Sequence, residues 1–157
     1  IKYLNRQAKE GADALQIFDS WIGCLSPADY EKYVFPYMKE LFSKINKSVQ
    51  TIHFGTGTSS LLKLMKKAGG TVMGFDWRVD INKAWKEIGS DSAVQGNLDP
   101  IVLFSTPSII KKHVKELLNK VKARNGHIFN LGHGVLPATP PDNVLALIDA
   151  VHEYSDS

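Results

Sequence analysis

One histidine between two glycines, Gly132-His133-Gly134, is the segment of this chain best suited to chemistry. It follows an apolar run and leads into a proline-rich turn that reaches Pro141. Glycine has no Cβ, so its backbone reaches conformations closed to other residues and lets a ligand approach the main chain. The imidazole of His133 can donate or accept a hydrogen bond near neutral pH. These residue types in this order predict a ligand-facing turn.

Comparable polar or glycine-bearing turns follow four other short apolar runs. The five runs, each succeeded by a longer helical pattern, span residues 14–18, 51–54, 71–75, 93–95 and 127–131. Strands that alternate with helices form parallel βα units, and ligands gather at the carboxyl ends of such strands. Five units fit an open doubly wound sheet of the flavodoxin type or the second half of an eight-stranded barrel. Periodicity alone does not choose between them.

Local signals place the helices that must hold these turns. Ser26 and Thr106 each stand directly before a proline, which predicts a capping hydroxyl at two helix starts. Asp80 is expected to cap a third helix. Asn125-Gly126 predicts the C-cap of the helix that begins near residue 109. Pro36 predicts either two helices or one kinked helix between residues 27 and 47.

Composition limits the class of protein. With 43% hydrophobic and 22% charged residues, residues 1–157 are expected to form a single domain fragment with a core. The formal charge is only +3, and the basic residues are dispersed apart from a cluster at 111–124. That cluster is typical of a solvated helix face, so no nucleic-acid partner is expected. No stretch approaches the ~20 apolar residues that span a bilayer, so no membrane is expected.

The single cysteine, Cys24, excludes an internal disulfide and a multi-thiolate metal site, and it is compatible with the reducing cytoplasm. The chain begins with Ile1, without an initiator methionine or a helix cap, while Leu4 and Ala8 share a helical face with Ile1. We therefore expect the chain to begin in the middle of a longer protein.

Two common site patterns are incomplete. Gly55-Thr56-Gly57 lacks the remainder of a phosphate-binding loop. Ser20, His133 and a nearby aspartate supply the residue types of a hydrolase triad, but Ser20 lacks the G-x-S-x-G turn that would expose a nucleophile. His53 is expected to be packed and hydrogen-bonded. The remaining histidines, expected to be structural or exposed, are His113, His127 and His152.

Four segments together resemble uroporphyrinogen decarboxylase, in that family's order and approximate spacing. They are GADALQIFDSW at 11–21, GFDW at 74–77, QGNLDP at 95–100 and NLGHG at 130–134. The resemblance covers nearly the whole chain but only the C-terminal half of the family's (β/α)8 barrel. It implies an α/β fold of about five βα units, forming the C-terminal half of a TIM-type barrel.

The resemblance also implies site residues. Ser20 matches a small hydroxyl residue that binds a substrate carboxylate, and His133 matches a histidine that contacts the substrate from the last strand end. Phe18 matches an aromatic position near the macrocycle, with ordinary core packing as the alternative. Asp76 and Asp99 are expected to be loop and cap residues of the rim, and the turn at Gly96 and Asn97 to serve the same purpose.

The family converts the four acetate side chains of uroporphyrinogen III to methyls in haem biosynthesis, with no metal or organic cofactor. The family's catalytic aspartate and an arginine-rich segment lie upstream, so no catalytic residue is expected in this chain and the chain alone is expected to be inactive. The expected partners are the tetrapyrrole, the missing N-terminal half and a second subunit in a homodimer. The open edges of a half barrel should themselves favour association.

Two alternatives remain. Related zinc methyltransferases act on corrinoids and thiols, but here His53-Phe54-Gly55 places glycine where a His-x-Cys pair would supply a thiolate. Cys24 alone cannot rebuild that site. The other alternative is a non-catalytic half-barrel module that binds tetrapyrrole carboxylates or a protein partner without turnover.

Overall fold

The computed structural model describes residues 1–89 and 91–155. Its sheet contains five parallel strands in the order β1-β2-β3-β4-β5: β1 Ala14–Asp19, β2 Gln50–Gly55, β3 Val72–Gly74, β4 Ala93–Gln95 and β5 His127–Ile128. All five predicted strands are confirmed. The last is shorter than predicted, because its partner β4 ends at Gln95 and only the isolated Leu98–Leu131 bridge continues the pairing.

The described residues also form seven α-helices and two short 3-10 helices. They are α1 Lys2–Lys9, α2 Pro27–Tyr33, α3 Phe35–Lys44, α4 Leu62–Ala68, α5 Ile81–Ile88, α6 Pro107–Val121, α7 Pro141–Ser155, η1 Ile22–Cys24 and η2 Pro100–Phe104. Pro36 sits in the first turn of α3, so the region predicted as two helices or one kinked helix forms two. Ser26 Oγ accepts from the Asp29 amide at 3.1 Å, and Asp80 Oδ1 accepts from the Lys83 amide at 3.0 Å, which confirms both caps.

The predicted start of α6 is confirmed, with Thr106 at the N-cap and Pro107 at the first helical position, but two details were wrong. Thr106 occupies the N-cap position but forms no capping bond, and its hydroxyl instead lies 3.0 Å from that of Ser108. The helix ends at Val121, so Asn125-Gly126 belongs to the turn that enters β5. The buried stripe of α6 ends with Val121, and packing no longer supports the helix beyond it.

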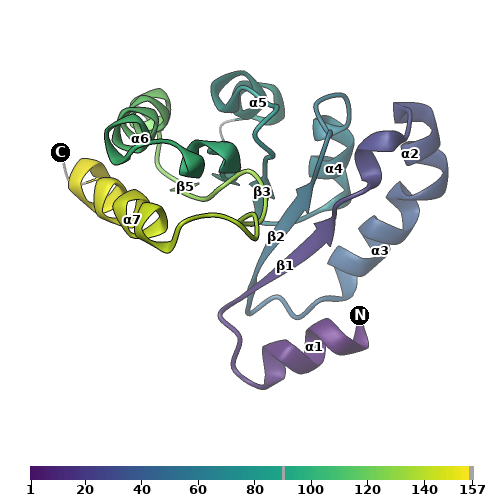
Figure 1. The fold of residues 1–157 in the computed structure, drawn as a ribbon. Helices are drawn as coiled ribbons and strands as arrows, with labels where there is room; N and C mark the ends of the chain where they lie inside the picture. The colour runs from purple at the N-terminus through teal and green to yellow at the C-terminus, as the bar shows by residue number, and fades with distance from the viewer. Residues whose placement is uncertain (90, 156–157) are drawn as a thin grey trace.

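The strand order settles the architecture. A doubly wound sheet reverses its strand order at a switch point, whereas here each strand pairs with the next in sequence. Right-handed crossovers then place the helices on one face, and Figure 1 shows α2 to α6 arching over that face with α7 beside α6. The predicted fold, α/β with five βα units in half of a (β/α)8-type barrel, is confirmed.

The other face of the sheet is concave. Three strand spacings separate β1 from β4, which amounts to about 14 Å along a flat sheet. Nevertheless, Gln95 Nε2 on β4 lies 3.2 Å from Gln16 Oε1 on β1. The sheet must therefore curl enough for side chains of non-adjacent strands to meet over its inner face.

The main core lies between the sheet and the helices, where Trp85 of α5 is buried and donates through Nε1 to the Ser92 carbonyl at 2.7 Å. A smaller cluster around Leu15 and Phe42 packs against α1. None of the helices in the described part of the chain is both long and apolar enough to cross a membrane.

Candidate functional site

The carboxyl ends of all five strands meet at one rim of the half barrel. Ser20 follows β1, Thr56 follows β2, Asp76 follows β3, Asn97 follows β4 and His133 follows β5. Parallel strands direct these ends the same way. The residues that the sequence singled out therefore share one edge of the sheet.

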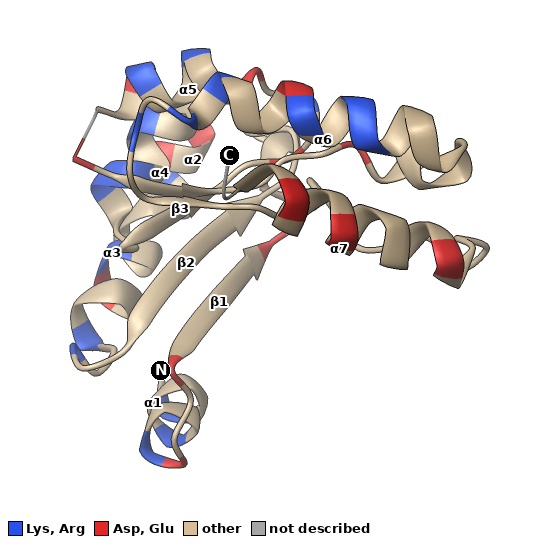
Figure 2. Cartoon of the chain, turned by 90° about the vertical axis from the view of Figure 1, so that its left-hand side faces the viewer, with Lys and Arg blue, Asp and Glu red and all other residues tan. Residues whose placement is uncertain are grey.

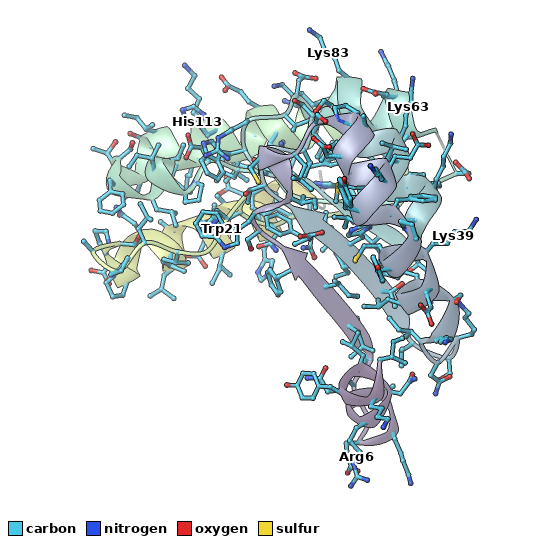
Figure 3. All side chains as sticks on the ribbon, turned by 90° about the vertical axis from the view of Figure 1, so that its right-hand side faces the viewer. Arg6, Trp21, Lys39, Lys63, Lys83 and His113 are labelled. Carbon is cyan, nitrogen blue, oxygen red and sulfur yellow. The ribbon has the colours of Figure 1, made fainter. Side chains whose placement is uncertain are left out.

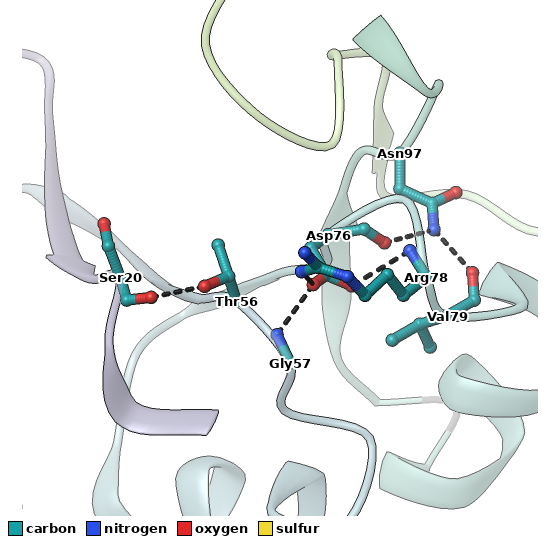
Figure 4. A network of polar contacts seen from close by, with 7 residues as sticks. All are labelled: Ser20, Thr56, Gly57, Asp76, Arg78, Val79 and Asn97. Atoms are coloured by element: carbon teal, nitrogen blue, oxygen red, sulfur yellow. Dashed lines mark hydrogen bonds and ion pairs between the residues drawn. The ribbon is translucent and has the colours of Figure 1, made fainter. Parts of the chain in front are cut away.

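Asp76 ties the second and third strand ends together. Its side chain is fully buried, with Oδ2 accepting from the Gly57 amide at 2.7 Å and Oδ1 accepting from the Arg78 amide at 3.1 Å. Arg78 Nη1 also donates to Asp76 Oδ2, at 3.0 Å (Figure 4). The prediction of a loop residue was correct, but the carboxylate acts as a strut between two strand ends.

Asn97 and Thr56 extend this network in both directions (Figure 4). Asn97 Nδ2 donates to the carbonyls of Asp76 at 2.8 Å and Val79 at 2.6 Å, which joins the fourth strand end to the third. The Thr56 hydroxyl donates to the Ser20 carbonyl and joins the second strand end to the first. Asp99 caps η2 through the Ile101 amide at 3.0 Å, as predicted.

The two glycines beside His133 differ in their surroundings. A Cβ on Gly132 would lie 2.3 Å from the Trp77 amide nitrogen, so only glycine fits where this backbone crosses the third strand end. The Gly132 amide also donates to the Leu98 carbonyl at 2.7 Å. A Cβ on Gly134 would meet nothing within 4 Å. Gly132 therefore fixes the loop, while Gly134 leaves the space beyond His133 open.

His133 is exposed at the rim and packs edge-on against Trp77, with ring centroids 5.8 Å apart. The Arg78 guanidinium lies over the same indole, 4.0 Å from its centroid. A cation over an aromatic face is an attractive arrangement. Trp77 thus organises one imidazole and one cation around a single aromatic ring.

Phe18 and Ser20 present the opposite side of the rim. Phe18 is 69% exposed and touches Phe54 edge-on at 5.8 Å, so it lies outside the core between sheet and helices. Ser20 is half-exposed. Trp21 is 87% exposed, and Figure 3 shows it on the side of β1 away from α2 and α3. Aromatic surface and a hydroxyl therefore border the concave face.

Asp19 points away from this face. It shares the alternation of Leu15 and Ile17, which pack toward the helices, and burial raises the pKa of its carboxyl. The buried Tyr30 hydroxyl of α2 has its pKa raised by burial and by the charge of Asp19. Within the described residues, no hydrogen bond joins Ser20 to His133. A hydrolase triad is therefore not assembled here.

The other histidines lie where the sequence predicted. His53 is fully buried, its Nδ1 lies 3.2 Å from the Gly69 carbonyl, and burial lowers its pKa to about 4. His127 Nε2 lies 2.6 Å from the Gly96 carbonyl, and burial also lowers its pKa. His152 is exposed, and His113 is partly buried.

The residues present do not fit the zinc site of the methyltransferase alternative. His53 shares the strand face of Met73 and Val94, which pack toward the helices, and its ring lies 4.9 Å from that of Phe42. Gly55 has no thiolate, and a Cβ there would already lie 2.8 Å from Thr58. Among the described residues, no group of three or more His, Cys, Asp or Glu could hold a metal.

The contributions of Trp77 and Arg78 were not predicted from the sequence. Trp77 lies in the GFDW segment that carries the family resemblance, but no role was assigned to it, and Arg78 follows that segment after the third strand. A cation and an indole in that position were the available signal. The contact of Trp77 with His133 depends on the close approach of Gly132 to the Trp77 backbone, which no sequence pattern reveals.

Comparison with known proteins gives a consistent result. A family model described as uroporphyrinogen decarboxylase (URO-D) matches residues 1–154. The chain is 49% identical over 156 residues to uroporphyrinogen decarboxylase of Carboxydothermus hydrogenoformans, covering 99% of this chain and 45% of that protein. It is 51% identical over 156 residues to the same enzyme of Geotalea daltonii, covering 99% and 46%.

Among solved structures, a methyltransferase from Methanosarcina mazei superposes with a TM-score of 0.86 at 24% identity, over 99% of this chain and 46% of that one. That likeness supports the fold alone. The chain spans slightly less than half the length of the relatives it matches. The match of residues 1–154 and the identity of about half along almost the whole chain lead to one conclusion: this chain belongs to the uroporphyrinogen decarboxylase family.

Proposed function

We propose that this chain, one domain fragment over residues 1–157, supplies part of the substrate cleft of a uroporphyrinogen decarboxylase. The enzyme would convert the four acetate side chains of uroporphyrinogen III to methyls in haem biosynthesis, giving coproporphyrinogen III. The supporting observation is that Phe18, Ser20 and His133, from the first and last strands, border one concave face. A flat, anionic macrocycle needs such a combination of aromatic surface and hydrogen-bond donors.

In the proposed reaction, a proton adds to the pyrrole α-carbon next to the ring carbon that bears the acetate. The resulting cation accepts the electron pair of the breaking C–C bond, carbon dioxide leaves, and a second proton converts the methylene to a methyl. Loss of the first proton restores the pyrrole. The pyrrole acts as its own electron sink, so no cofactor is required.

The residues of this chain would bind and orient the substrate. The Ser20 hydroxyl and a His133 N–H would donate to substrate carboxylates, while the Phe18 ring would pack against the macrocycle. Trp77 would hold the imidazole of His133 in place. None of these groups supplies the negative charge that a developing pyrrole cation requires.

We further propose that the chain alone is inactive. Each aspartate near the rim already has a structural role, since Asp76 accepts from Gly57 and Arg78, Asp99 caps η2, and Asp19 faces the helices. The stabilising carboxylate must then come from the remainder of the protein. The proposed partners are that remainder and a second subunit of a homodimer, in the cytoplasm.

Anaerobic product analysis tests the proposal. Uroporphyrinogen III is incubated with this chain, with this chain co-folded with the remainder of the protein, and with a full-length family member as positive control. Coproporphyrinogen III is expected only in the second and third samples. Product from this chain alone would contradict the assignment of the catalytic carboxylate to the missing part.

The same assay separates the rivals. If the verified complex binds the tetrapyrrole but forms no product, the non-catalytic binding module is the better description. Methyl transfer to a thiol with stoichiometric zinc would support the methyltransferase instead. That result would also contradict the inward packing of His53 against Phe42.

A further inference from the structure

Arg78 is the only Lys or Arg in the rim segments, all of which the structure describes. These segments, which follow the five strands, are 19–26, 55–61, 75–80, 96–106 and 129–140. The chain has nineteen Lys and Arg residues, yet Arg78 alone lies in these segments. Figure 2 shows the other basic positions mainly on the helices, and β1 and β2 carry none.

Two contacts hold the Arg78 guanidinium in place. One is its ion pair with Asp76, at 3.0 Å, and the other is the Trp77 ring, whose centroid lies 4.0 Å from the guanidinium carbon. The Asp76 side chain is fully buried, whereas that of Arg78 is 55% exposed. A guanidinium has five N–H donors in a fixed plane, and the ion pair uses one of them. The remaining donors are held at the surface in a defined orientation.

The guanidinium lies at the mouth of the concave face. Gly74 pairs with Phe54 and with Gln95, and Phe18 occupies the same register on the same face. Asp76 continues this alternation two residues beyond Gly74. The Arg78 guanidinium, which is paired with Asp76, therefore lies on the inner side of the rim. It contacts the same Trp77 indole as His133 does.

We propose that Arg78 is a carboxylate-binding residue that holds an acidic side chain of the tetrapyrrole beside His133. The inference rests on the proposed function and extends it to a residue outside the four segments that carry the family resemblance. A planar guanidinium can bind a carboxylate through two parallel hydrogen bonds, which a lysine ammonium cannot reproduce. Because Asp76 and Trp77 fix the side chain in advance, binding costs little of its rotational freedom.

The test uses the full-length protein that contains this chain, with the variants Arg78→Gln, Arg78→Lys and, as a matched control, Lys83→Gln on α5. The measurements are KM and kcat with uroporphyrinogen III, and the Kd for oxidised uroporphyrin by fluorescence titration. R78Q should raise KM and Kd about tenfold or more, as expected for a lost charge-assisted hydrogen bond. R78K should fall between R78Q and the wild type, and K83Q should stay within about twofold.

Two outcomes would overturn the inference and leave the proposed function intact. In one, an active wild type and R78Q share the same KM and Kd. In the other, R78Q lowers the melting temperature and kcat without changing KM or Kd, which is the signature of a structural role. If R78Q does not fold, an unchanged Kd in R78K decides against the proposal. A wild type that neither binds uroporphyrin nor forms product overturns the proposed function as well.

Discussion

Acid should weaken this fold through His53. The imidazole is fully buried against Phe42, and its Nδ1 lies within hydrogen-bond distance of the Gly69 carbonyl. Burial lowers its pKa from 6.5 to about 4. The unfolded chain therefore binds a proton on this group more readily than the folded chain does, and protonation favours unfolding.

The sign and size of the effect follow from these two pKa values. The stability that neutral His53 contributes is fully present above the unfolded-state pKa of 6.5. It declines as the pH falls toward the folded-state pKa of about 4. Between pH 7 and pH 5 the expected loss is about 2 kcal/mol, and it approaches about 3 kcal/mol below the folded pKa. His127 contributes in the same direction, while Asp19, whose pKa is raised, contributes in the opposite direction.

A difference measurement isolates His53 from these other groups. Urea unfolding at pH 7 and pH 5 would compare the wild type with His53→Gln, which keeps a donor for Gly69 but does not titrate, and with His113→Gln, whose side chain is 44% exposed, as a control. H53Q should lose about 2 kcal/mol less than the wild type on acidification, and H113Q should follow the wild type. A direct NMR titration of His53 would give its pKa without a mutation. An NMR value above 6, or equal acid losses in wild type and H53Q, would refute the buried, metal-free packing argued for this residue.

Three further changes probe the rim. Gly132→Ala forces a Cβ into contact with the Trp77 backbone and should destabilise the chain by about 2 kcal/mol in urea unfolding, while Gly134→Ala should stay within about 0.5 kcal/mol because its Cβ meets open space. Asp76→Asn should cost about 2 to 4 kcal/mol in the same assay, since a buried carboxylate that accepts two amides and a guanidinium is replaced by a neutral amide; a cost below about 0.5 kcal/mol would contradict its role as a strut. In the full-length enzyme, His133→Ala should lower kcat/KM at least about tenfold, whereas the equivalent change at His152, exposed on α7, should have little effect. Equal, near-native rates for both histidine variants would remove His133 from the site.

The fold was largely predictable because its signals are local. Strand formers, turn residues and the Ser26 and Asp80 caps lie within a few positions of the elements they define, and the five strands and both caps were found where predicted. The end of α6 was misplaced because packing of Val121, rather than the Asn125-Gly126 pair, decides where the helix stops. The choice between open sheet and half barrel depended on strand order, which periodicity does not contain.

The candidate site was predictable only in part, for a related reason. His133 and Ser20 were found through neighbouring residues and a family resemblance, and their role remains a prediction. The roles of Trp77 and Arg78 were not predicted, because they arise from the packing of Arg78 on the Trp77 ring and from the contact of the Gly132 loop with the Trp77 backbone. That contact joins residues more than fifty positions apart in the sequence.

The rim has a buried layer, which stabilises the fold, and an exposed layer, which we expect to contact the substrate. Asp76, Asn97 and Gly132 are buried and bind main-chain atoms of neighbouring strand ends, so substitutions there should lower stability first. The exposed layer, which includes Phe18, Arg78 and His133, has few such ties. Substitutions there should therefore change substrate affinity or turnover while the unfolding free energy stays nearly constant, and a variant of the exposed layer that unfolded the chain would show that the two layers are not separable.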